Sequence, residues 1–511
     1  MRLTPRQERQ RSAEAHPWAM AGVPPPGRPD GAALAWWGIP YSAASMSQRR
    51  FALPTPPPAW EEAGDLDEPG PACFQLAPRG VTLPDLGDES SEDCLHLNVW
   101  APSHHSAESL PVLVWIHGGL FVSGTANNFS GAALAARGGM VVVTVNYRLG
   151  PWGFIPPRCS PPGEGSIHPN LGLLDQVAAL RWVQANIAQL GGDPRRVTIA
   201  GQGTGATCAL ALTSMPIAEH LFHQILLFSP QELDSPEQLD TTTPALADAL
   251  SIDIRGLTEA LRSLPNDELA LAASTVIQAP PKRPLWRPHA FAAWVDGRVL
   301  PAHRETDELD GPGRPRPMLV STCAEEVNLQ AAVDPVWARA CEAAVRSSMG
   351  QVAWNRMKAL YESTFGEEHW RNSLLTDGLY RQPAIRLLER QAAAGGLGWM
   401  MTFDHHPEVP PLDRMGACHG SDLPYVWTDP NDSGASYFPG LNSHVDRQMA
   451  EILQAAIAGF VHTGRPDSDL SARWSPYNAK DRVVFRLSPA SAFDRDPGAE
   501  LRHSWGGLDL G

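Results

Sequence analysis

The sequence has few cysteines, no long apolar run and no excess of basic charge. Seven cysteines in 511 residues are sparse and odd in number, which is typical of a mostly reduced protein with a hydrophobic core of its own. No run reaches the roughly 18 uncharged apolar residues of a membrane-spanning helix, so none is expected. The formal net charge of −16 argues against nucleic acids and acidic membrane surfaces as partners. Phosphate-binding glycine loops and clusters of metal ligands are also lacking, so we expect no cofactor and no metal.

The first twenty residues, MRLTPRQERQRSAEAHPWAM, lack the apolar core of a secretory signal, and we predict a cytoplasmic protein. Residues 1–32 are polar and carry several prolines, so we expect a disordered N-terminal arm. Residues 33–511 show no repeat and no obvious linker. We predict that they form a single domain, because large α/β folds often reach this length.

Apolar runs alternate with helical patterns along the chain. Six runs predict buried strands: PVLVWIHGG, MVVVTVNYRLG, RVTIAG, HQILLFS, RPMLVST and GWMMTF. Apolar residues at spacings of three and four predict two helices. The first carries Leu173, Val177, Leu180, Val183, Ile187 and Leu190. The second carries Met449, Leu453, Ala456 and Phe460 and is expected to end at Gly464. This order predicts an α/β fold with a large, mostly parallel central sheet and helices on both faces. The composition of residues 231–315 predicts a helical excursion from that sheet.

The segment RRVTIAGQGTGATCALAL, residues 195–212, has the layout of a nucleophile elbow. An apolar strand runs into a Gly-x-Gly-x-Gly turn and then into a helix of small residues. The attacking side chain of such an elbow would stand at Gly203, which has none. Without a hydroxyl or thiol at this position, no covalent acyl intermediate can form there.

Eight segments, in order from about residue 34 to the C-terminus, resemble the type-B carboxylesterases, the cholinesterase-like branch of the α/β-hydrolase fold. They are GIPYSAASMSQRRF, PACFQ, SEDCLHLNVWAP, WIHGGLFVSG, VNYRLGPWGF, NLGLLDQVAALRWVQANIAQLGGDPRRVTIAG, GACHGSDLPYVW and FVHTGRP…RWSPY. The sequences of SEDCLHLNVWAP and GACHGSDLPYVW resemble those of bacterial esterases more than those of animal esterases. The resemblance implies an α/β-hydrolase fold over residues 33–511 and a pocket for a small-molecule ester or another apolar ligand; a protein partner is the alternative.

The resemblance also implies an oxyanion hole, a set of backbone N–H groups for the negative oxygen of an attacked ester. The segment His117-Gly118-Gly119 follows a predicted strand and matches the family's glycine-rich loop. The donors would be Gly118, Gly119 and Thr204. The loop's third glycine is replaced by Leu120, which narrows the pocket.

The base and its orienting acid are assigned by the same resemblance. GACHGSDLPYVW resembles the catalytic-histidine segment and assigns the base to His419. MLVSTCAEEVNLQ resembles the segment of the acid and assigns it to Glu326, with Glu325 as the alternative. Ser229 resembles a family serine that lies behind the catalytic residues.

The family's Gly-Glu-Ser-Ala-Gly motif reads Gly-Gln-Gly-Thr-Gly here, so three neighbouring positions depart from it. Gln202 removes a carboxylate that would favour a charged His419, and Thr204 puts a β-branched residue beside the turn. Glycine adopts the strained backbone conformation of the apex with almost no loss of stability, whereas a residue with a Cβ destabilises the fold by about 1–3 kcal/mol there. Neuroligins, adhesion members of the family, resemble this pattern with glycine at the apex.

Two functions follow from this pattern. The first is a pseudoenzyme, which keeps the pocket, the oxyanion loop and the His/Glu pair but is inactive or a very weak esterase. The second is a working ester hydrolase in which His419 and Glu326 activate a water, or in which Thr204, Ser123 or Ser229 attacks. We favour the first.

Two further pairs are implied by the resemblance alone. Cys73 and Cys94 match the family's first disulfide. The sequence leaves open whether they are bridged or, in a reducing cytoplasm, stay as thiols. Glu92 and Arg148 match a buried ion pair of the family.

Overall fold

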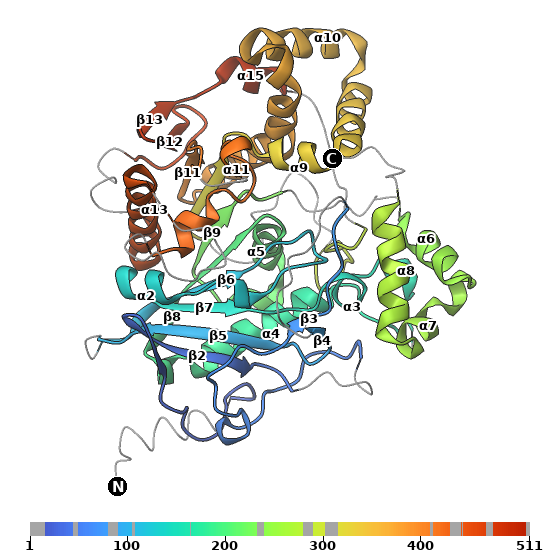
Figure 1. Ribbon diagram of the computed structural model, residues 1–511, viewed down its shortest axis with the longest axis vertical. Coiled ribbons are helices and arrows are strands. Elements are labelled where there is room, and N and C mark those ends of the chain that lie inside the picture. The colour runs from blue at the N-terminus through green and yellow to red at the C-terminus, as the bar shows by residue number, and fades with distance from the viewer. Residues whose placement is uncertain are drawn as a thin grey trace.

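The computed structural model describes residues 16–43, 50–79, 90–104, 108–163, 165–231, 240–279, 290–301, 315–408, 412–429, 441, 443–466 and 474–506 (Figure 1). The strands are β1 (Arg28–Asp30), β2 (Ala33–Pro40), β3 (Ala72–Cys73), β4 (Ser90–Ser91), β5 (His96–Pro102), β6 (Leu110–Ile116), β7 (Val141–Val145), β8 (Gly192–Gln202), β9 (Gln224–Phe228), β10 (Met318–Cys323), β11 (Gly398–Phe403), β12 (Val483–Leu487) and β13 (Ala492–Arg495). The helices are α2 (Ala132–Gly138), α3 (Gly150–Gly153), α4 (Leu171–Asn186), α5 (Thr204–Ser214), α6 (Thr242–Leu250), α7 (Leu257–Ser263), α8 (Asn266–Gln278), α9 (Val327–Val333), α10 (Pro335–Thr376), the π-helix η7 (Asp377–Arg381), α11 (Gln382–Ala393), α12 (Leu423–Trp427), α13 (His444–Thr463) and α15 (Ala499–Ser504).

One large sheet organises these elements. In the described part of the chain it has eleven strands in the order β1-β2-β5-β7-β6-β8-β9-β10-β11-β12-β13. The strands from β7 to β12 in this order run parallel, and antiparallel pairs flank them at both edges. All six strand predictions coincide with members of this parallel region, β6 to β11, so the mostly parallel sheet is confirmed.

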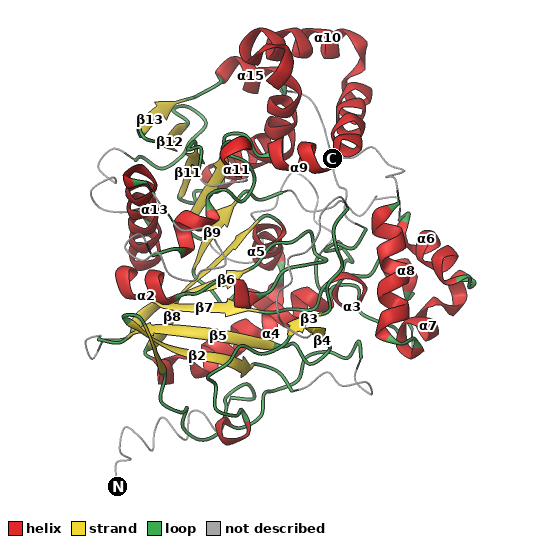
Figure 2. Cartoon of the chain, in the orientation of Figure 1, coloured by secondary structure: helices red, strands yellow, loops and turns green. Residues whose placement is uncertain are grey.

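Side chains of a strand alternate between the two faces of the sheet. In the central strands the side chains on both faces are apolar, so both faces must be covered by helices. On β6, Val112, Val114 and Ile116 join the apolar cluster that includes α4 and α5. Leu113 and Trp115 point the other way, into the cluster that includes α2 and α13. Figure 2 shows helices on both sides of the strands. A strand apolar on both faces cannot face water on either.

Two groups of helices lie beyond the sheet. Helices α6, α7 and α8, the green group in Figure 1, form the helical excursion predicted for residues 231–315. The second group, α9 to α11 with α15, was not predicted as a separate layer. Its longest member, α10, changes direction at Gly350 and Gly366, which have positive φ angles of 75° and 80°. Tryptophans 337, 354, 370 and 505 help to fill a third apolar cluster within this group.

The structure differs from the expected disordered arm over residues 16–32; residues 1–15 lie outside the described ranges. Met20 is fully buried, and its backbone N–H donates to Oδ1 of Asn186 at 2.8 Å. The amide of Asn186 donates in turn to the carbonyl of Trp18 at 2.8 Å. The stretch is polar on average, but its apolar side chains Trp18 and Met20 pack against the core beside α4.

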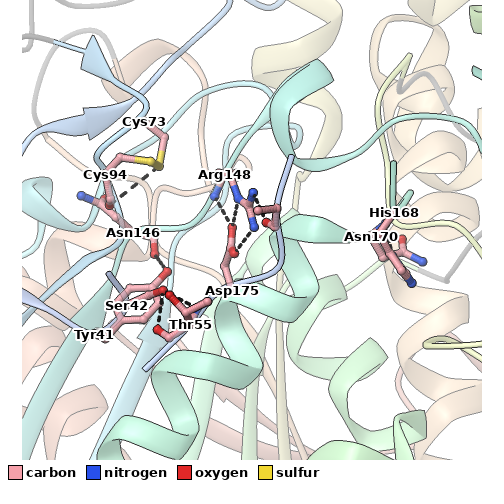
Figure 3. Close-up of polar contacts among 11 residues, drawn as sticks. Tyr41, Ser42, Thr55, Cys73, Cys94, Asn146, Arg148, His168, Asn170 and Asp175 are labelled. Carbon is pink, nitrogen blue, oxygen red and sulfur yellow. Dashed lines mark hydrogen bonds and ion pairs between the residues drawn. A yellow bond between two sulfur atoms is a disulfide. The ribbon is translucent and has the colours of Figure 1, made fainter. Parts of the chain in front are cut away.

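The polar scaffold beside the sheet corrects one prediction (Figure 3). Arg148 does not pair with Glu92: its guanidinium contacts both carboxylate oxygens of Asp175, at 2.6 and 2.7 Å. Glu92 lies 2.6 Å from Arg50 instead. Asp175 is fully buried on α4 and a buried carboxylate needs a buried cation, which explains the exchange of partners.

Cys73 and Cys94 form a disulfide, with their Cα atoms 4.9 Å apart. The pairing implied by the resemblance is therefore present. The structure therefore decides the alternative that the sequence left open, in favour of the disulfide.

Candidate functional site

The elbow lies at the carboxyl end of β8, in the middle of the parallel region. Gly203 separates β8 from α5 and has φ 56° and ψ −123°, a conformation that favours glycine. Its backbone N–H donates to the carbonyl of Phe228 on the neighbouring strand β9 at 2.9 Å. Active-site groups of open α/β sheets gather at this end of the strands. The strand-turn-helix layout predicted from residues 195–212 is present.

His419 lies against Glu326, and not against Glu325. Its Nδ1 is 2.7 Å from Oε2 of Glu326, which is buried in the turn after β10. The other oxygen of Glu326 accepts from the backbone N–H of Cys323 at 2.7 Å, which fixes the carboxylate. Glu325 contacts His406 at 3.0 Å instead. The geometry of a histidine oriented by a carboxylate is thus formed by the pair predicted first.

The imidazole of His419 faces the apex of the elbow. A Cβ atom added to Gly203 would lie 2.9 Å from Nε2 of His419. The structure therefore brings Gly203, Glu326 and His419 together. At 2.9 Å the ring is closer than a real Cβ allows, so the histidine takes up space that a side chain at position 203 would need.

Gln202 contacts His419 directly, which the sequence analysis did not anticipate. Its side-chain nitrogen lies 2.9 Å from Nε2 of His419. Because an amide nitrogen only donates, Nε2 accepts, and the ring proton sits on Nδ1, facing Glu326. This tautomer is assigned from the hydrogen-bond network. The signal in the sequence was the position of Gln202 directly before the apex.

The charges around His419 oppose one another. Burial lowers its pKa, but the hydrogen bond and the charge of Glu326, together with the charge of Asp422, outweigh burial and leave the pKa above its ordinary value. Asp422 is itself fully buried, and burial followed by repulsion from Glu326 raises its pKa to about 7. Neither oxygen of Asp422 has a side-chain hydrogen-bond partner among the described residues. Sequence analysis missed Asp422, although it stands three residues after His419 in GACHGSDLPYVW.

The predicted oxyanion loop, which begins with His117, Gly118 and Gly119, lies beside the elbow. A Cβ atom on Gly118 would come within 2.6 Å of the backbone carbonyl of Gln202, so only glycine fits there. The backbone N–H of Phe121 reaches Oγ1 of Thr204 at 3.4 Å, which joins the loop to the start of α5. Across the described ranges, the N–H groups of Gly118 and Gly119 have no backbone or side-chain acceptor. These N–H groups are available to a ligand, as is that of Thr204 in the first turn of α5.

The remaining candidates are held in the structure in different ways. Leu120, at the position of the third glycine, has a φ of 58° that favours glycine. The hydroxyl of Ser123 donates to the carbonyl of Gly119 at 3.0 Å. Ser229 is buried just after β9, and its backbone N–H donates to the carbonyl of Ser321 at 2.7 Å. The hydroxyls of Thr204 and Ser123 are thus engaged with the oxyanion loop.

Within the part of the chain that the structure describes, no group of three or more His, Cys, Asp or Glu side chains is placed to hold a metal ion. None of the helices in these ranges combines the length and apolar character needed to cross a membrane.

Comparison with known proteins gives a family. The carboxylesterase family model matches residues 26–500. The chain is 32% identical to the para-nitrobenzyl esterase of Bacillus subtilis over 476 residues, 91% of this chain and 94% of that protein. It is 27% identical to mouse neuroligin-3 over 548 residues, 91% of this chain and 65% of that protein. The crystal structure of a Geobacillus stearothermophilus carboxylesterase superposes with a TM-score of 0.79 at 32% identity, covering 94% of this chain and 97% of that one. The chain belongs to the carboxylesterase family.

Proposed function

We propose that this protein binds a small ester-like or other apolar molecule in an esterase pocket and forms no acyl-enzyme. One observation carries the proposal: the residue that faces the base His419 at the apex of the elbow is Gly203, which has no nucleophilic atom. Acyl transfer through a covalent intermediate needs a hydroxyl or thiol beside the base.

Activation of water is disfavoured by the contact of Gln202. The lone pair that would take a proton from water is on Nε2 of His419, and it already accepts from the amide of Gln202 at 2.9 Å. Attack by Thr204 or Ser123 is disfavoured because their hydroxyls interact with the oxyanion loop. A binding site and an oxyanion hole without a triad still accelerate hydrolysis by roughly 10³–10⁴-fold over water. We therefore expect weak turnover and not complete inertness.

A small-molecule ligand is favoured over a protein partner by the relatives with esterase or hydrolase names, which include a phenmedipham hydrolase at 30% identity. Neuroligin-3, also a relative, keeps the protein partner as the alternative. The cytoplasmic location stays a prediction. It is tested by alkylating the free thiols of protein isolated from its native host: alkylated Cys73 and Cys94 would support a reducing cytoplasm, and an intact disulfide between them would contradict it.

The test compares the wild type with the Bacillus para-nitrobenzyl esterase under the same conditions. With p-nitrophenyl acetate, the wild type should show slow linear turnover without a burst, and a fluorophosphonate should leave its mass unchanged. The Bacillus enzyme provides the positive control for both reagents. Stoichiometric labelling of the wild type at any serine or threonine would overturn the proposal. Binding is measured with p-nitrobenzyl acetate, which should raise the melting temperature and be recovered mostly intact after the measurement. An unchanged melting temperature would refute the proposal that the protein binds such a molecule.

A further inference from the structure

Several hydrogen-bond donors without an acceptor in the described residues belong to the elbow and to the loop beside it. The side-chain nitrogen of Gln202 lies 2.9 Å from Nε2 of His419, which becomes a second donor once the ring is protonated. The backbone N–H groups of Gly118, Gly119 and Thr204 come from the oxyanion loop and the start of α5. Gln202 is neutral, and the carboxylate of Glu326 lies on the opposite, Nδ1 side of the ring. A ligand at the apex therefore meets donors and no facing carboxylate.

Protonation of His419 creates a conflict that an anion resolves. In the neutral ring, Nε2 accepts from Gln202. In the protonated ring, the same two nitrogens are donors facing each other at 2.9 Å. A flip of the Gln202 amide would present its oxygen to the ring. Its NH₂ group would then take the place of Oε1, which lies close to Gly118: a Cβ added to that glycine would be 3.0 Å from Oε1. The flipped amide would therefore lose the position of its oxygen beside the loop. An acceptor that bridges both nitrogens satisfies both donors without a flip.

The imidazole of His419 can be reached from solvent, and its pKa is raised above the ordinary value. The side chain of His419 is 27% exposed, and Gly203 puts nothing in front of it. The titratable groups around the ring and its acid are Glu326, Asp422, Tyr380, Cys323 and Cys418. The charge of Glu326 favours the imidazolium, and Asp422 adds to it only where it is ionised, above a pH of about 7. The buried tyrosine and thiols are neutral because burial raises their pKa values.

We propose that the elbow binds the carboxylate of a small apolar organic acid in preference to the corresponding neutral ester or amide. One carboxylate oxygen accepts from Nε2–H of His419 and from the amide of Gln202. The other accepts from the N–H groups of the oxyanion loop and of Thr204. Binding takes up one proton, on His419. This inference rests on the proposed function, because a serine at the apex would occupy the position of the ligand oxygen.

Calorimetric titration with benzoate and with benzamide tests the inference. Benzoate should bind at least tenfold more tightly at about pH 6, and its affinity should fall about tenfold per unit as the pH rises past the pKa of His419. Titrations in two buffers of different ionisation enthalpy should report uptake of one proton at alkaline pH. Equal binding of benzoate and benzamide, or benzoate binding without proton uptake, would overturn the inference.

Two variants locate the site. Gln202→Glu places a negative charge beside the ligand and should weaken benzoate at least tenfold, whereas Gln351→Glu, the same change at an exposed position of α10, should leave it unchanged. His419→Gln keeps a hydrogen-bonding side chain and should abolish the pH dependence. An effect of Gln351→Glu as large as that of Gln202→Glu would contradict the site. Fluorophosphonate labelling separates the two failures: a labelled wild type refutes the proposed function, and an unlabelled wild type that does not prefer benzoate refutes this inference alone.

Discussion

The amide nitrogen of Gln202 lies 2.9 Å from Nε2 of His419, the ring nitrogen that faces the side-chain-free apex at Gly203. The opposite nitrogen of the same ring is 2.7 Å from Glu326. Both nitrogens of the histidine therefore have partners within the protein. An imidazole in this state is well oriented, but its basic lone pair is not free.

The first prediction concerns the closeness of His419 to the apex. Gly203→Ala should lower the free energy of unfolding by about 2–4 kcal/mol, because the added Cβ is both strained by the positive φ and 2.9 Å from Nε2. Gly297→Ala is the matched control: it has a φ of +68° but open space around the added Cβ. It should cost about 1–2 kcal/mol, from strain alone. Urea denaturation measures both, and equal losses would show that the ring does not crowd the apex.

The second prediction concerns recovery of catalysis. Gly203→Ser alone should gain little esterase activity, since the new side chain crowds His419 and competes with Gln202 for Nε2. Adding Gln202→Glu and Thr204→Ala should give an acyl-enzyme burst, fluorophosphonate labelling and an increase in kcat of about 10² or more, a fraction of the roughly 10⁶ that a serine–histidine pair supplies. Adding His419→Gln to this triple variant should remove the gain. A folded triple variant that stays inert would place further losses outside the elbow.

The third prediction concerns Asp422 and pH. Its pKa is raised to about 7 in the folded state from about 3.9 when unfolded, so the folded protein holds the extra proton between these values. Stability therefore falls as the pH rises from about 4 to about 7, by up to about 1.4 kcal/mol per unit. His419, whose folded pKa is also raised, adds a loss of the same sign above about pH 6.5.

Asp422→Asn should flatten the fall between about pH 4 and 6, where His419 contributes little. Glu259→Gln, at an exposed position on α7, should leave it unchanged. The free energy of unfolding in urea across this range decides the matter. An unchanged slope in Asp422→Asn would mean that this carboxyl ionises as freely as in water.

The fourth prediction separates the two ion pairs of the scaffold. Asp175→Asn leaves the buried guanidinium of Arg148 without its counter-charge and should lower the free energy of unfolding by about 3–5 kcal/mol. Glu92→Gln should cost only about 1–2 kcal/mol, because Arg50 keeps Oδ1 of Asn266 at 3.0 Å as a partner. Denaturant titration of both variants provides the comparison. The reverse order of losses would restore the pairing of Glu92 with Arg148.

Much of the fold was readable in the sequence because its signals are local. Each of the six apolar runs became a strand, since a strand buried on both faces needs continuous apolar side chains. The helix that contains Met449 begins at His444 and ends before Gly464, which has the expected left-handed conformation. The helices around α10 were missed as a separate layer because their tryptophans bury one another across long separations, which periodicity does not report.

The sequence by itself determined the elbow, the resemblance to the carboxylesterases and the candidate positions 118, 119, 203, 204 and 419, because the motifs that carry them are local stretches of sequence. It left open which of two adjacent glutamates reaches the histidine. It suggested a loose arm where Met20 packs against α4, and an ion pair that the structure replaces. Only the tertiary structure decided that Gln202 donates to His419 and that Asp422 is buried near Glu326. Gln202 ends strand β8, whereas Glu326, His419 and Asp422 lie in turns far away in the sequence. How these side chains face one another depends on how strands distant in sequence are brought side by side.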